Sequence, residues 1–111
     1  LDNVYNLELS QLYQIFYQTL KRAKEIPEEE PIREVKVEKD TYSLEDMILS
    51  LSSRIRRGES LHFRELLVAI ETKSGMVTIF MAVLELLKQQ VMEMRYEDDD
   101  IIFTAALDGA V

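Results

Sequence analysis

His62 is the only histidine in the 111-residue chain, and histidine is the side chain that most often serves as a general base. Nucleophilic catalysis would also need a nucleophile motif and an orienting acid beside it, and the sequence offers no such motif. The chain contains no cysteine, which excludes disulfide frameworks and zinc sites built on thiolates. We therefore expect no catalytic residue, and we assign His62 to a turn or cap before a short helix.

Three consecutive aspartates, Asp98 to Asp100, could suggest a cation site. Calcium loops alternate ligands with spacer residues around a glycine turn, whereas three adjacent aspartates in a tight turn cannot all face one ion. The glycines, Gly58, Gly75 and Gly109, form no phosphate-binding loop. The sequence predicts a solvated turn here, and no metal, cofactor or small-molecule substrate.

The chain is acidic, with 21 Asp and Glu residues, 13 Lys and Arg residues and a formal net charge of −8. Proteins that read DNA need clustered cations for phosphate contacts, so we expect no direct sequence-specific nucleic-acid binding. The one basic cluster consists of Arg54, Arg56, Arg57 and Arg64. It could touch a phosphate backbone, or it could pair with nearby acids or with an acidic partner. No apolar run approaches the roughly 20 residues that span a bilayer, and we expect no membrane contact.

Hydrophobic residues make up 47% of the chain, enough for one packed domain with an appended element. Periodicity, caps and breakers predict helices over 7–24, 44–57, 64–70 and 75–90, and short strands over 32–37, 61–63, 91–97 and 101–105. This is the element order of a winged helix. The predicted fold class is mainly α with a small β-hairpin: an N-terminal helix (1–25), an acidic linker with a short strand (26–40), a C-terminal winged-helix domain (41–107) and a tail (108–111).

The predicted helix over 75–90 is the most informative element. A DNA-reading winged helix exposes polar and basic side chains there, whereas Lys88 is the only base in this range. Its apolar residues cover an arc of about 200°, wider than a one-sided helix needs, so we expect an exposed flank that binds a partner. Together with the hairpin, this flank supplies six expected partner-binding residues: Ile79, Val83, Leu86, Met92, Met94 and Ile102. We assign Phe80, Leu84 and Leu87, on the other side of this helix, to the domain's own core. There we expect them to pack with Leu51, Ile55 and Leu66.

The N-terminal helix carries an apolar stripe of its own. Leu12, Phe16 and Leu20 recur at four-residue spacing along it. A second partner-binding surface formed by these three side chains is one interpretation. Packing of the stripe onto the rest of the chain is equally open.

The segment from Met76 to Lys88 (MVTIFMAVLELLK) resembles the third helix of the C-terminal winged helix in the ScpA family, the kleisin subunits of bacterial SMC complexes. Three further segments resemble the family in the same order: 9–24, 42–47 and 61–67. One departure concerns the wing, where Arg95 to Ile101 lacks the family's Phe and Gly. Contacts that the family makes through its wing tip are therefore in doubt here.

The resemblance implies a non-enzymatic kleisin fragment that docks on the SMC ATPase head, associates with ScpB and acts in chromosome condensation and segregation. Such a protein would be cytoplasmic and nucleoid-associated, and the ATPase would belong to its SMC partner. The chain starts at Leu1 without a methionine and shows no counterpart of the family's neck-binding domain, so we expect a fragment of a longer protein. The alternative function is that of a DNA-binding winged-helix transcriptional regulator.

Overall fold

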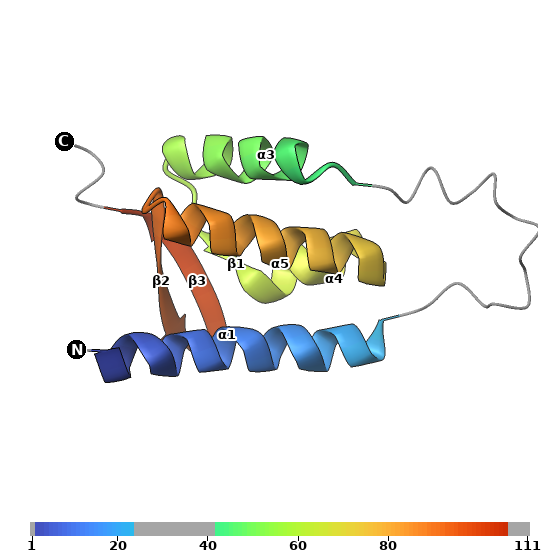
Figure 1. Ribbon diagram of the computed structural model, residues 1–111, viewed down its shortest axis with the longest axis horizontal. Coiled ribbons are helices and arrows are strands. Elements are labelled where there is room, and N and C mark those ends of the chain that lie inside the picture. Colours follow the sequence, from blue (N-terminus) through green and yellow to red (C-terminus); the bar gives the residue numbers. More distant parts are fainter. Residues whose placement is uncertain (1, 24–41, 107–111) are drawn as a thin grey trace, which may run out of the picture.

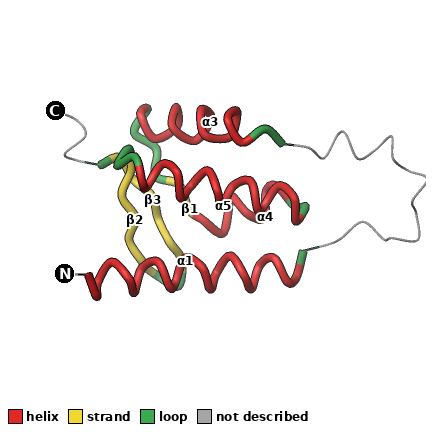
Figure 2. Tube along the Cα trace, viewed as in Figure 1, coloured by secondary structure: helices red, strands yellow, loops and turns green. Residues whose placement is uncertain are grey.

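A computed structural model describes residues 2–23 and 42–106, with the side chains of the first helix described from Leu7 onward. This part of the chain is mainly helical and has a small three-stranded antiparallel sheet (Figure 1, Figure 2). In chain order the elements are α1 (Asp2–Arg22), α3 (Leu44–Arg56), β1 (Leu61–His62), α4 (Phe63–Ile70), α5 (Lys73–Lys88), β2 (Met92–Glu97) and β3 (Asp100–Ala105). The predicted linker with its strand over 32–37, and the predicted tail, lie outside the described residues.

Both ends of α3 are set by hydrogen bonds of neighbouring residues. The Ser43 hydroxyl accepts a hydrogen bond of 3.2 Å from the Asp46 N–H and so satisfies a donor of the first turn. At the other end Gly58 adopts a φ of +91°, which costs glycine little, and its N–H donates to the Ile55 carbonyl at 3.0 Å. The predicted start and stop of this helix are confirmed.

Helix α5 begins earlier than predicted. Thr72 is its N-cap and accepts a hydrogen bond of 3.1 Å from the Gly75 N–H. The predicted start at position 75 is therefore two residues late, because Gly75 lies inside the first turn. It is buried there, and a Cβ atom at this position would meet the side chains of Ile70 and Tyr42.

The sheet has the strand order β1-β3-β2, with β3 in the centre. Its register aligns Leu61 and Met94 on either side of Phe103, which places these three side chains on the face that packs on the core. Asp98 and Asp99 connect β2 to β3 with φ values of +55° and +64°. Two positive φ values in a two-residue loop are typical of a type I′ hairpin turn, so the predicted turn is confirmed and is shorter by one residue.

All seven elements contribute to one hydrophobic core. Phe63 and Phe103 meet edge to face at its centre, with ring centroids 5.8 Å apart. Helix α1 supplies Leu12, Ile15 and Phe16 and packs against α4, α5 and the hairpin strands (Figure 1). The apolar stripe of the N-terminal helix therefore closes this chain's own core.

Candidate protein-binding surface

The side of α5 that we expected to face a partner is the buried side. Helix α5 contacts α1, α3, α4 and β2. Because these elements pack around it, more than one side of α5 is buried. Five of the six expected partner-binding residues have exposed fractions of 7% or less, whereas Met94 is half-buried against the core. The five buried residues are Ile79, Val83, Leu86, Met92 and Ile102. Their expected exposure is wrong, and their role in partner binding stays a prediction.

The opposite side of α5 carries an uncovered apolar strip. Val77, Met81 and Leu84 are exposed by 39%, 48% and 37%. They follow at spacings of four and three residues and therefore line one side of the helix. The assignment of Leu84 to the core is therefore wrong. Phe80 and Leu87 are half-buried and pack against the core, as predicted. Leu51, Ile55 and Leu66 are buried within the core, which is also as predicted.

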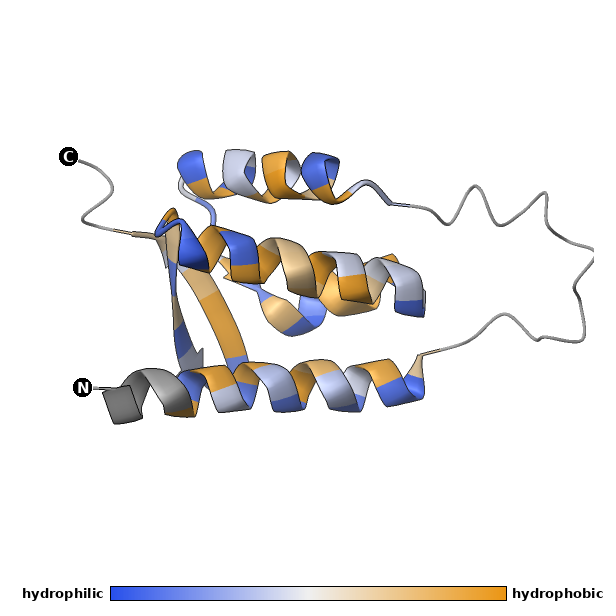
Figure 3. Ribbon diagram, in the orientation of Figure 1, coloured by the Kyte–Doolittle hydropathy of each residue, from blue (hydrophilic) through white to orange (hydrophobic). Residues whose placement is uncertain are grey.

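Two tyrosines of α1 extend this strip. Tyr13 and Tyr17 are exposed, and their rings stack with centroids 6.1 Å apart. Phe80 joins the two helices, because it stacks on Phe16 at 4.1 Å and meets the edge of Tyr13 at 6.5 Å. Figure 3 shows hydrophobic colours on the outward side of α5, next to α1. We call these side chains the α1–α5 face: Tyr13, Tyr17, Val77, Phe80, Met81 and Leu84.

The stripe of α1 that we considered for partner binding lies beneath this face. Leu12 and Phe16 are buried and Leu20 is half-buried against the core. A partner-binding role for these three side chains stays a prediction, although none of them is exposed on the surface. Neither tyrosine was among the partner-binding residues expected from the sequence, although their four-residue spacing is the signal that indicates a shared side of the helix.

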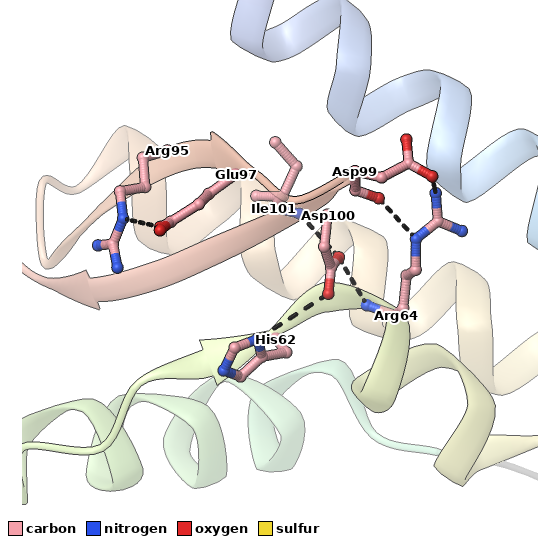
Figure 4. Close-up of polar contacts among 7 residues, drawn as sticks. All are labelled: His62, Arg64, Arg95, Glu97, Asp99, Asp100 and Ile101. Carbon is pink, nitrogen blue, oxygen red and sulfur yellow. Dashed lines mark hydrogen bonds and ion pairs between the residues drawn. The ribbon is translucent and has the colours of Figure 1, made fainter.

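The polar residues of the predicted turn form hydrogen bonds at the tip of the β2–β3 hairpin (Figure 4). One oxygen of Asp100, Oδ1, accepts hydrogen bonds from the backbone N–H of Arg64 at 3.2 Å and of Ile101 at 2.7 Å. The Arg64 Nε donates to the Asp99 carbonyl at 2.8 Å, and His62 Nδ1 lies 3.9 Å from Asp100 Oδ2. Asp100 is half-buried, so the prediction of a fully solvated turn is wrong for this residue, whereas Asp98 and Asp99 are exposed.

The outer side of the hairpin is also polar. The Tyr96 hydroxyl donates to Asp99 Oδ1 at 3.0 Å, and this hydrogen bond raises the pKa of Tyr96 because the carboxylate favours the protonated phenol. Arg95 and Glu97 form an exposed ion pair at 2.8 Å (Figure 4). Within the described ranges, no group of three His, Cys, Asp or Glu side chains is placed to hold a metal ion.

Most of the predicted basic cluster is paired with acids of the same chain. Glu59 accepts hydrogen bonds from Arg54 at 2.9 Å and from Arg57 at 3.0 Å, and these two bonds lower the pKa of Glu59. Arg64 pairs with Asp99 at the tip of the β2–β3 hairpin. Of the alternatives left open for these arginines, pairing with nearby acids is therefore confirmed for three of the four.

An exposed apolar face beside polar groups that satisfy one another is typical of a small domain that binds other proteins. The profile of the family described as Segregation and condensation protein ScpA matches residues 3–103, and this chain belongs to that family. It is 31% identical over 96 residues to Segregation and condensation protein A of Macrococcus caseolyticus (strain JCSC5402). That alignment covers 86% of this chain and 38% of the relative, so the chain spans well under half of the relative's length.

No solved structure matches the chain. Among the described helices, none is both long enough and apolar enough to cross a membrane.

Proposed function

We propose that this chain is the winged-helix docking segment of a kleisin subunit, which serves chromosome segregation and condensation by binding the SMC ATPase head and ScpB. The family supports the role. The order of α3, β1, α4, α5 and the β2–β3 hairpin supports the winged-helix assignment. The chain contributes binding rather than catalysis, at the nucleoid in the cytoplasm, and ATP hydrolysis belongs to the SMC partner.

The exposed side of α5 carries this proposal. In a DNA-binding winged helix the corresponding helix lies in the major groove and presents polar and basic side chains to it. Here the outward strip consists of Val77, Met81 and Leu84. Burial of apolar surface stabilises a complex by about 25 cal/mol per Å². An apolar surface on a protein partner can bury this strip, whereas the polar and charged surface of a DNA groove is a poor match for it.

A DNA-binding transcriptional regulator is the rival function. Its strongest support would be the four arginines between positions 54 and 64, but Arg54, Arg57 and Arg64 are paired with carboxylates of this chain. The net charge of −8 also opposes attraction to phosphates. Both observations favour a protein partner.

Two binding measurements test the proposal. Co-purification of this chain with a purified SMC head fragment, and separately with ScpB, is expected to give a stable complex with the head. A gel-shift titration with random duplex DNA in 50–200 mM salt is expected to show weak binding. Tight, steeply salt-dependent DNA binding without either protein complex would establish the regulator instead.

A further inference from the structure

We draw no further inference here: the strongest candidate, the exposed apolar α1–α5 face, has both basic and acidic side chains beside it, and nothing in the described part of the structure shows what covers it.

Discussion

Asp100 caps helix α4 from the hairpin, because its Oδ1 accepts a hydrogen bond of 3.2 Å from the backbone N–H of Arg64, 36 positions earlier in the chain. His62, the N-cap residue of α4, makes no side-chain hydrogen bond to the helix. The carboxylate of Asp100 therefore does what an N-cap side chain normally does, and its negative charge also suits the N-terminal end of the helix dipole. One residue fixes the hairpin relative to α4.

Asp100→Ala is expected to destabilise the protein by about 1 kcal/mol, the usual effect of removing an N-cap acceptor. Asp100→Asn keeps an oxygen that can accept from the same N–H and should lose less. Urea unfolding followed by circular dichroism measures both. Equal losses in the two variants would show that the charge of Asp100, rather than the hydrogen bond to Arg64, stabilises α4.

Val83 and Leu84 are adjacent in sequence and point about 100° apart around α5. Val83 is fully buried, whereas Leu84 is 37% exposed. Val83→Arg should unfold the protein, because an unpaired buried charge is among the changes that cost more than about 4 kcal/mol. Leu84→Arg should remain folded. Thermal melts of the two variants measure the difference.

Val83→Arg cannot report on partner binding alone, because it removes the fold together with any interface. A folded Val83→Arg protein with a melting temperature near that of wild type would contradict the orientation of α5 described above.

The sequence predicted where the helices and strands lie far better than which way α5 faces. Ser43 and Gly58 act through neighbouring backbone groups, so local sequence is enough to place the ends of α3. The apolar arc of α5, in contrast, is wide enough to bury either flank. The choice between Val83 and Leu84 depends on where the other elements pack around it, and spacing along one helix does not contain that information.

Long-range contacts explain the other differences. The three consecutive aspartates correctly predicted a turn, but the bond from Arg64 to Asp100 joins segments that are distant in sequence. The aromatic contact between Phe16 and Phe80 joins helices that are still further apart along the chain. It makes α1 part of the core and leaves Tyr13 and Tyr17 on the surface. The spacing of the tyrosines indicates a shared side of α1, but their exposure depends on how α1 packs.

Gly75→Ala is expected to destabilise the protein, although alanine is the better helix former by about 1 kcal/mol. A Cβ at this position would collide with the Ile70 side chain and lie 3.0 Å from Tyr42 Cε2. Overpacking of this kind costs about 1–3 kcal/mol, which outweighs the gain in helix propensity. Urea unfolding measures the net effect.

Shortening the neighbour identifies the cause of that loss. Ile70→Ala is expected to reduce the penalty of Gly75→Ala in the double variant, because it removes the Cγ1 atom that the new methyl group would meet. Additive losses would show that Gly75 is required for another reason.

Glu59 provides a pH-dependent test of the pairing at the end of α3. Hydrogen bonds from Arg54, and then from Arg57, hold the pKa of Glu59 below its usual value of 4.5. A lowered pKa in the folded state means that the ionised carboxylate stabilises the fold above pH 4.5 and that this contribution is lost as the pH falls through the lowered pKa. The melting temperature of Glu59→Gln should therefore lie below that of wild type at pH 7 and converge with it in acid.

The two arginines can be separated by measuring the pKa of Glu59 from its carboxyl carbon by NMR. Arg54→Gln should raise the pKa of Glu59 towards 4.5 more than Arg57→Gln does, since the hydrogen bond from Arg54 has the larger effect. Both arginines and Glu59 are partly solvent-exposed, so salt should weaken the pH dependence of stability. An unchanged Glu59 pKa in both variants would show that the two arginines do not pair with this carboxylate in solution. Arg54 and Arg57 would then be available to bind an acidic partner.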